Sequence, residues 1–443
     1  MKKFKKPGVR LAIRSFLLPV LVGVVGLVLW AALVSIGTLY GWGRKSFAPA
    51  GNAAAFMSSA TNAIAANYRG SAAFRLIKKG ELYDEYFVSA GEPVDSETLF
   101  QVASLSKWIT AWGVMTLVEA GKLDLDAPVA TYLTRWTLPE SEFDNSKVTV
   151  RRLLSHTAGL TDSLGYAGFP PGAEVQSLEA SLTRAADASP TADGRVRVGF
   201  APGTKWRYSG GGYTLLQLVI EETSGEAFES YMQRAVFQPL GMNRSTFAVD
   251  PARMSNVATL YDLDGKAATH RRFTALAAAS FYTTASDMTR LIQAHLTGSN
   301  GEPAGRGVLK PNKLKLMRQP HASQMGADIW GLGTMLYAPN GAGDFIIGHD
   351  GKRQPAINAT VRLNPSTGDG IVLLQTGNQL LATTVAGEWV FWQTGTIDFL
   401  MFTLVAKKMV AIICIGWGVI ILAALCVGWR RSNATQPGSG SSL

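Results

Sequence analysis

The chain has 443 residues, of which 47% are hydrophobic and 17% are charged, and its formal net charge is +10. This composition excludes an intrinsically disordered chain, and the length suffices for one large domain or two modest ones. The positive charge does not indicate a nucleic-acid surface, because residues 1–45 hold 8 Lys and Arg and residues 395–443 hold 4, against one acid. The rest of the chain is therefore close to neutral.

Two uncharged apolar segments lie near the ends, at residues 15–42 and 409–429. Each is long enough to cross a bilayer as a helix, which takes about 20 residues. Lys and Arg mark the cytoplasmic side of membrane proteins, and residues 1–14 hold six of them and residues 430–443 two. We therefore expect two transmembrane helices with cytoplasmic ends and residues 46–395 outside the cytoplasm. The first segment is longer than the apolar region of a secretory signal, which favours an uncleaved anchor over a cleaved one.

Residues 396–408, before the second span, are too short to cross a membrane, and we expect them to lie in its interface. Both cysteines, Cys414 and Cys426, fall inside the second span. The outward domain therefore has no disulfide, thiol nucleophile or Cys-ligated metal. Its five histidines have no zinc-binding spacing, so the sequence predicts neither a metal nor a cofactor.

The predicted elements of the central domain begin with an Ala-rich helix over residues 52–68, whose apolar positions recur at helical spacing. The further predictions are strands at 73–77 and 83–89, helices at 100–117, 213–222 and 228–236, strands at 331–337, 356–363 and 370–375, and a helix at 381–392. Strands near both ends with helices between them predict an α/β (α+β) fold, in which one antiparallel sheet is completed by both chain ends.

The first candidate for chemistry is the segment Q-V-A-S-L-S-K, which contains Ser104 and Lys107. Residues three apart share a helix face, so the Lys107 amine can reach the Ser104 hydroxyl. A serine needs a neighbouring base, and a lysine serves as one only when its pKa is lowered, for example by desolvation. Trp108, Ile109 and Trp112 are apolar neighbours that favour desolvation. Taken alone, the spacing fits an ordinary solvated helix face equally well.

Two further motifs contain groups that can transfer protons. Tyr208 precedes three glycines and a predicted helix, which indicates a loop tip where a substrate approaches closely. An aromatic plug over the core is the alternative for this tyrosine. His349 ends an apolar run in the polar tip Gly-His-Asp-Gly, where Gly351 lets a substrate backbone lie beside a strand edge. A hydrogen-bonded turn histidine is the alternative there.

The order S-x-x-K, then Y-S-G about a hundred residues later, then H-x-G resembles the serine β-lactamase and penicillin-binding-protein superfamily. The text between these motifs is similar to the branch of class C β-lactamases, D-Ala-D-Ala carboxypeptidases and related esterases. It matches F-x-x-x-S-x-S-K at residues 100–107, L-L-S-H-T-A-G-L at 153–160 and P-L-G-M at 239–242. The resemblance spans residues 55–392 and implies a β-lactamase/transpeptidase-like fold with a helical subdomain.

The resemblance also implies roles for the site residues. Ser104 would be the acylated nucleophile, Lys107 its general base, and Tyr208 the phenol that shuttles the proton. His349 would line the groove, in the place of the Lys or His of the third motif. The backbone N–H groups of Ser104 and Lys352 would form the oxyanion hole.

The sequence departs from the family pattern at two points. Residue 210 is Gly where the family has Tyr-x-Asn, so the amide that would hold a substrate carbonyl is missing, and His349 replaces the Lys that β-lactamases usually carry. Both departures weaken the prediction of efficient β-lactam hydrolysis. Lys352 and Arg353, after Gly351, would bind a substrate carboxylate, with two solvated loop cations as the alternative. His156 is expected to be a structural loop residue.

We therefore expect a membrane-anchored serine hydrolase that cleaves an amide or ester of a small-molecule or peptide substrate through a Ser104 acyl-enzyme, without nucleic acid. A peptidase on D-amino-acid-containing or cell-wall-type peptides is the first alternative and a carboxylesterase the second. A non-turnover receptor acylated by β-lactams is the third, which the short cytoplasmic ends disfavour. The implied location is a bacterial inner membrane with a periplasmic or extracellular domain. The acyl group, the leaving group and the oligomeric state stay open.

Overall fold

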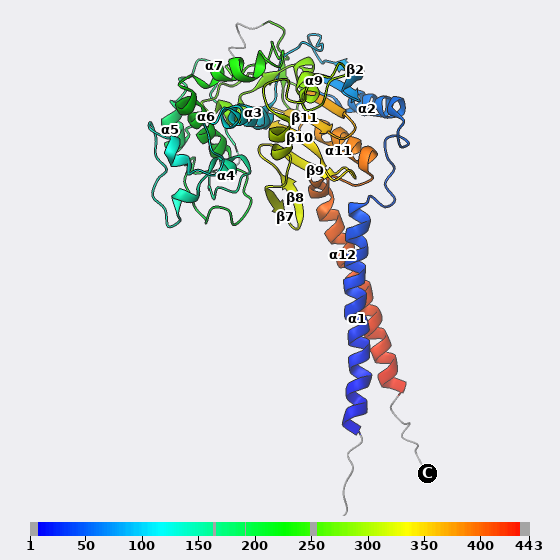
Figure 1. Cartoon of the computed structure of the whole chain (residues 1–443). Helices are drawn as coiled ribbons and strands as arrows, with labels where there is room; N and C mark the ends of the chain where they lie inside the picture. Colours follow the sequence, from blue (N-terminus) through cyan, green and yellow to red (C-terminus); the bar gives the residue numbers. More distant parts are fainter. Residues whose placement is uncertain (1–7, 163–164, 191, 249–254, 435–443) are drawn as a thin grey trace, which may run out of the picture. The chain divides into compact units, whose positions relative to one another are not determined.

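The computed structural model describes residues 8–162, 165–190, 192–248 and 255–434 (Figure 1). The chain divides into two compact units. One unit is Ser46–Thr394, and the other consists of both ends, Met1–Lys45 with Gly395–Leu443. All of the candidate catalytic residues belong to the first unit.

Within the described residues, eight strands form one antiparallel sheet in the order β2-β1-β12-β11-β10-β9-β8-β7. The strands are β1 (Ala72–Lys78), β2 (Glu81–Val88), β7 (Ala322–Gln324), β8 (Ala327–Trp330), β9 (Met335–Pro339), β10 (Phe345–Arg353), β11 (Ile357–Asn364) and β12 (Asp369–Thr376). The pairing of β1 with β12 joins the first hairpin of the domain to its last strands. The predicted sheet, completed by both ends of the domain, is confirmed.

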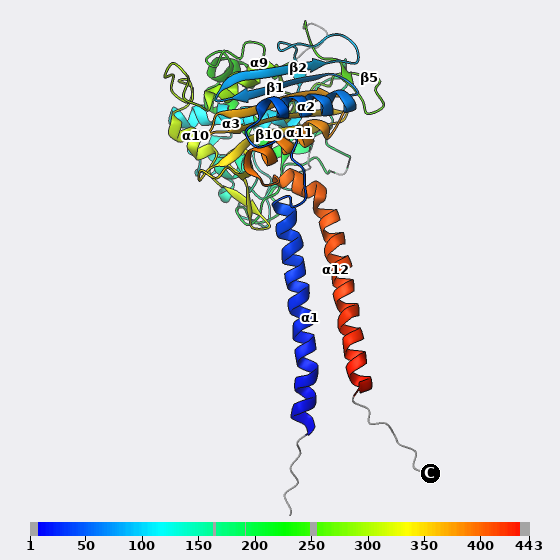
Figure 2. The same ribbon diagram turned by 90° about the vertical axis from the view of Figure 1, so that its right-hand side faces the viewer.

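Helices cover both faces of this sheet, which explains why its central strands are buried on both sides. Every residue of β11 and β12 is buried. On one face lie α2 (Ala53–Asn67) and α11 (Leu381–Thr394), side by side in Figure 2. The other face packs against α9 (Ala285–Ala294), which contacts β1 and β12. Residues on alternate positions of one strand therefore face different sets of helices.

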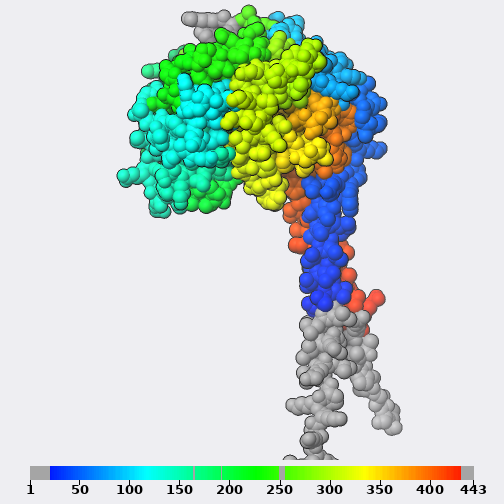
Figure 3. Space-filling view, in the orientation of Figure 1, coloured from blue at the N-terminus to red at the C-terminus, as the bar shows by residue number. Residues whose placement is uncertain are grey.

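Between β2 and β7 the described chain forms a helical region that also contains two small two-stranded sheets. Its elements are β3 (Phe100–Gln101), α3 (Ser106–Glu119), α4 (Val150–Leu154), α5 (Leu178–Arg184), α6 (Gly210–Ser224), α7 (Phe228–Met232), β4 (Leu260–Tyr261), β5 (Ala267–Ala268), α8 (Leu276–Ala279), β6 (Tyr282–Thr283) and α10 (Pro311–Met317). Helices α3, α6 and α8 contact one another in its core. The space-filling view shows this region, in cyan and green, beside the later residues in yellow (Figure 3).

Three predicted elements differ from the structure. The helix predicted over 100–117 is preceded by β3 and a 3₁₀ turn, because Ala103 has a φ of +47° that no α-helix accommodates. The strand predicted over 331–337 begins only at Met335, as β9, because residues 331–334 form a turn in which Gly333 has a φ of +72°. Residues 348–351, predicted to form a polar tip, lie inside strand β10, which stays paired with β11 through Arg353.

The two ends of the chain form long helices, α1 (Gly8–Leu39) and α12 (Phe399–Ala434). By length and composition, the described residues contain two stretches that suit a membrane span, Val20–Leu39 and Phe399–Arg430. Residues 396–408, predicted to form an interfacial segment, lead without a break into the second of these helices from Phe399 onward. Their position at a membrane interface stays a prediction.

Helices α1 and α12 contact each other within their unit through two tryptophans. Trp30 Nε1 donates to the Ile412 carbonyl at 3.3 Å, and Trp417 Nε1 donates to the Leu27 carbonyl at 2.9 Å. A Cβ on Gly416 would lie 2.0 Å from Trp30 Nε1, so the glycine makes room for the indole. Each helix thus holds the other by an indole N–H that would otherwise lack a partner among apolar side chains.

Candidate active site

Ser104 lies in the 3₁₀ turn Ala103–Leu105, directly before α3, and Lys107 lies in the first turn of α3. Residues three apart are eclipsed in a 3₁₀ turn, and this brings the two side chains together. The Lys107 Nζ is 3.3 Å from the Ser104 Oγ and donates a second hydrogen bond to the Ala278 carbonyl at 2.7 Å. The predicted contact is therefore present, although it does not arise from a continuous α-helix.

The Lys107 amine is almost fully buried, with only 2% of the residue exposed. Burial removes water from the ammonium form and lowers the pKa of Lys107 to about 7, while the negative charge of Asp162 opposes this shift. An amine with a pKa near 7 is largely neutral at slightly alkaline pH. A neutral amine at 3.3 Å is able to accept the proton of the serine hydroxyl.

Tyr208 lies in the loop before α6 and faces the same two side chains. Burial raises the pKa of Tyr208, and the nearby Ser104 side chain opposes this rise. The Lys107 Nζ lies 4.8 Å from the centre of the Tyr208 ring. Ser209 fixes the loop, because its hydroxyl accepts the Gly212 N–H at 2.8 Å and caps α6. The plug alternative for Tyr208 therefore does not describe its position.

His349 and Gly351 lie on the same face of β10, the face that approaches the turn containing Ser104. A Cβ on Gly351 would lie 1.8 Å from the Val102 carbonyl oxygen, so only glycine lets β10 lie this close to the turn that carries Ser104. The His349 ring is buried, and its Nδ1 lies 2.6 Å from the Asp350 carbonyl. A carbonyl only accepts, so Nδ1 carries the proton and Nε2 is a bare acceptor.

The charge state of His349 follows from its surroundings. Burial and the positive charge of Lys107 lower the pKa of His349 to about 3. Its Nε2 is buried without a hydrogen-bond partner in the structure, and its ring lies edge-on to Trp330 with centres 5.5 Å apart. His349 is thus neutral at physiological pH and presents no cation to a substrate, unlike the lysine of β-lactamases.

Lys352 and Arg353 point to opposite faces of the sheet, since side chains alternate along a strand. Lys352 is exposed on the side of Asp350, whose carboxylate accepts the Thr383 hydroxyl of α11 at 2.6 Å. Arg353 lies on the side of His349, and its Nη2 donates to Gln101 Oε1 at 2.7 Å. Of the two predicted carboxylate-binding side chains, the structure brings only Arg353 to the face that carries Ser104.

Arg353 carries hydrogen-bond donors that no group of the described structure accepts. Its Nε and Nη1 are buried without a partner, and so is the Nε2 of the adjacent Gln101. The guanidinium lies over the Phe273 ring at 4.8 Å, and burial lowers the pKa of Arg353 to about 10, so it keeps its charge. A positive charge with unused N–H groups favours an anion.

The sequence analysis missed three side chains of this centre. His156, expected to be a structural loop residue, lies against Tyr208 with ring centres 4.4 Å apart and ring planes tilted by 35°, and its Nδ1 accepts the Ser209 N–H at 3.1 Å. Trp330 packs edge-on against both His156 and Tyr208. Asp162 is buried beside the start of α6. The one available signal for Asp162 was its place at the end of the L-L-S-H-T-A-G-L-T-D stretch.

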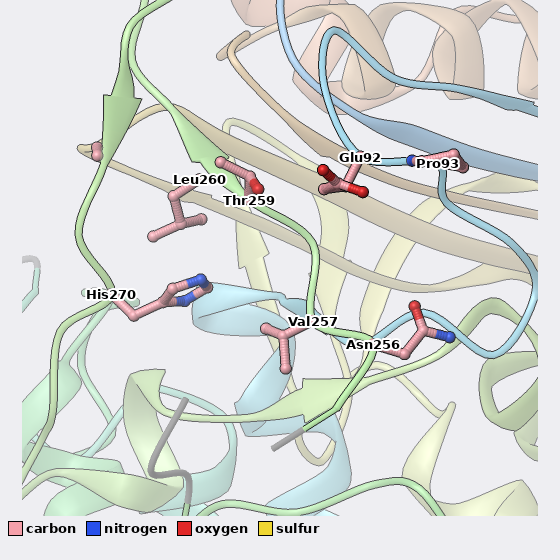
Figure 4. Close-up of a pocket in the computed structure, with 8 residues that line it drawn as sticks. Glu92, Pro93, Asn256, Val257, Thr259, Leu260 and His270 are labelled. Atoms are coloured by element: carbon pink, nitrogen blue, oxygen red, sulfur yellow. The ribbon is translucent and has the colours of Figure 1, made fainter. Parts of the chain in front are cut away.

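A cavity of about 490 Å³ lies elsewhere in the helical region (Figure 4). It is lined by Glu92, Pro93, Asn256, Val257, Thr259, Leu260, Ala268 and His270. None of the four predicted catalytic side chains reaches it. Size alone does not define a catalytic site, and Ser104 and Lys107 are not among the residues that line this cavity.

A serine that meets a buried lysine and a tyrosine, on an antiparallel sheet with helices on both faces, defines a serine hydrolase of the β-lactamase/transpeptidase type. The family model described as Beta-lactamase matches residues 59–389, and the chain belongs to this family. The recognised superfamily is thereby confirmed, and so is the prediction of a serine hydrolase.

Three comparisons show the range of similar proteins. Penicillin-binding protein 4 of Amycolatopsis lactamdurans is 29% identical over 299 residues, which are 65% of this chain and 74% of that relative. Esterase EstB of Burkholderia gladioli is 33% identical over 177 residues, but the match spans only 38% of this chain and 43% of the esterase. The structure of an octameric penicillin-binding protein homologue from Pyrococcus abyssi is 23% identical, with a TM-score of 0.61 over 81% of this chain and 77% of that chain. That similarity shows the fold.

Proposed function

We propose that the protein is a membrane-anchored hydrolase in which Ser104 forms an acyl-enzyme with an amide or ester substrate. The observation that carries this proposal is the meeting of Ser104, Lys107 and Tyr208. Neutral Lys107 takes the proton of Ser104 while the oxygen attacks the substrate carbonyl. Tyr208, which faces both residues, then delivers its proton to the leaving group and is reprotonated by the Lys107 ammonium, so that the proton of Ser104 ends on the leaving group. Water releases the acyl group from Ser104 in a second step.

The oxyanion of the tetrahedral intermediate would be held by the backbone N–H groups of Ser104 and Lys352. The close approach of Gly351 to the segment before Ser104 supports this pairing, since it places β10 beside the nucleophile. Each donor of such a pair contributes about 3–4 kcal/mol to the transition state. The neutral Nε2 of His349 would accept a hydrogen bond from the substrate in the same groove.

For the substrate, a peptide or ester with a free carboxylate is supported by Arg353 and its unused donors. A D-amino-acid-containing or cell-wall-type peptide has such a terminal group. The carboxylesterase alternative is supported by Gly210, which provides no amide side chain to hold the carbonyl of a peptide. The similarity to Esterase EstB, 33% identical over 177 residues, favours the same alternative.

Anchoring at both ends is supported by the two apolar stretches, Val20–Leu39 and Phe399–Arg430. The basic residues before the first stretch and after the second favour cytoplasmic ends and an outward hydrolase domain, as in a bacterial inner membrane. A hydrolase in this position would act on peptides or esters that are outside the cytoplasm and near the membrane surface.

The test uses the full chain in detergent, treated with a fluorescent fluorophosphonate and separately with a fluorescent penicillin. Ser104→Ala is the control, because it removes only the attacking oxygen. We expect both the wild type and Ser106→Ala, a neighbouring hydroxyl, to be labelled by the fluorophosphonate and Ser104→Ala to be unlabelled. Labelling of Ser104→Ala at the wild-type level refutes the acyl-enzyme. Labelling by the fluorophosphonate alone, with turnover of a carboxylate-free ester, selects the esterase over the peptidase.

A further inference from the structure

Asp162 is a buried acid around which the turn after Tyr208 is built. Only 4% of the residue is exposed, and its carboxylate accepts the Ser209 hydroxyl and the Gly211 N–H. These donors lie at the N-terminus of α6, a helix of 15 residues whose dipole favours a negative charge there. A Cβ on Gly211 would lie 2.8 Å from the Asp162 Cγ. Gly211 therefore makes room for this carboxylate.

The ionisable groups around Lys107 show why a carboxylate matters at this position. Asp162 is the acid whose charge acts on the amine, and it favours the ammonium form. His156 and His349 are both buried and neutral, because burial and the charge of Lys107 lower their pKa values. Tyr208 faces the amine as a neutral phenol, since burial raises its pKa. Among these described groups, Asp162 alone carries a negative charge.

We propose that Asp162 is a positioning residue of the catalytic centre, whose carboxylate is the counter-charge of Lys107 and holds the turn that carries Tyr208. This inference rests on the proposed function, in which Lys107 becomes a buried cation when it takes the proton of Ser104. A buried ammonium without a counter-charge is strongly unfavourable. Asp162 offsets that cost when Ser104 is acylated. Residue 210 is a glycine and offers no side-chain amide for this purpose.

Burial raises the pKa of Asp162 to about 6, against the hydrogen bonds of Ser209 and Gly211, which lower it. The carboxylate is thus largely ionised at the pH where Lys107, with a pKa of about 7, begins to lose its proton. In Asp162→Asn the charge is gone, so the ammonium form of Lys107 loses its stabilisation and its pKa falls further. The base then becomes available at lower pH, but it accepts the proton of Ser104 less readily.

The experiment measures kcat and KM of the full chain for an activated neutral ester between pH 5 and 9. For Asp162→Asn we expect the acid limb of kcat/KM to move to lower pH by about one unit, and kcat on the plateau to fall by about tenfold or more. We expect KM to change little, because Asp162 does not contact the substrate. An acid limb that stays at the wild-type pH in a folded Asp162→Asn protein overturns the inference.

Thr214→Val is the matched control, because it removes an uncharged buried hydrogen bond of the same helix, between the hydroxyls of Thr214 and Tyr166 at 2.8 Å. We expect its acid limb to coincide with that of the wild type. If Asp162→Asn does not fold, Ser209→Ala replaces it: one bond to the carboxylate is lost, and the limb should move the same way by a smaller amount. An unmoved limb in Ser209→Ala then overturns the inference. Activity retained by Ser104→Ala would refute the proposed function itself.

Discussion

The close approach of β10 to the nucleophilic turn predicts the effect of Gly351→Ala. A new Cβ would lie 1.8 Å from the Val102 carbonyl oxygen, and real Cβ contacts essentially never fall below 3.0 Å. The strand and the turn must therefore separate by more than 1 Å, the difference between these two distances. A displacement of about 1 Å at reacting groups costs about a hundredfold in rate, whereas overpacking costs about 1–3 kcal/mol of stability. We expect kcat/KM to fall by about two orders of magnitude.

The matched control is Gly370→Ala in β12, where a new Cβ would meet the Arg362 carbonyl and the Ile292 side chain at 3.1 Å. This contact is tight but far from Ser104. We expect Gly370→Ala to lower stability modestly and to leave kcat/KM unchanged. The assay combines ester hydrolysis with thermal unfolding of both variants. Wild-type kcat/KM in Gly351→Ala would refute the argument that this glycine positions the oxyanion-binding edge.

Three further predictions follow from single side chains. Tyr208→Phe keeps the ring but removes the proton relay, so kcat should fall about 10²–10⁴-fold with little change in KM. A rise in KM with an unchanged kcat would contradict the relay. Arg353→Gln should raise KM about tenfold or more for a carboxylate-bearing ester and leave its neutral amide analogue unaffected; an equal rise for both would exclude carboxylate recognition. His295 lies between Trp108 and Trp112, with both ring nitrogens buried and unpartnered, and burial lowers its pKa to about 3. The unfolded histidine protonates near pH 6.5 and the folded one does not, so its contribution to stability is present above pH 6.5 and is lost as pH falls toward 3, at about 1.4 kcal/mol per pH unit. Denaturant unfolding of His295→Leu should therefore show a shallower loss of unfolding free energy below pH 6.5 than the wild type. Equal pH dependence of the unfolding free energy in both proteins would refute this.

Much of the reaction centre was predictable because its signals are local. The i, i+3 spacing of Ser104 and Lys107 brings the two side chains together in an α-helix and in a 3₁₀ turn alike. The contact was therefore predicted correctly although the predicted local conformation was wrong. Tyr208 was recognisable from the glycines that follow it, and the antiparallel sheet from strand-like runs at both ends of the domain. These patterns depend on neighbouring residues, and a single sequence contains them.

Tertiary structure decided what depends on residues far apart in the chain. The Asp162 carboxylate accepts the Gly211 N–H at the start of α6, 49 positions later in the chain, and no sequence spacing predicts this contact. The opposite directions of Lys352 and Arg353 follow from β10 remaining a paired strand, where the sequence had indicated a turn. The charge states depend on burial, which is set by the packed helices around Lys107 and His349. The sequence indicated Ser104, Lys107 and Tyr208 as the candidate reacting groups, whereas packing sets which side chains meet them and in what protonation state.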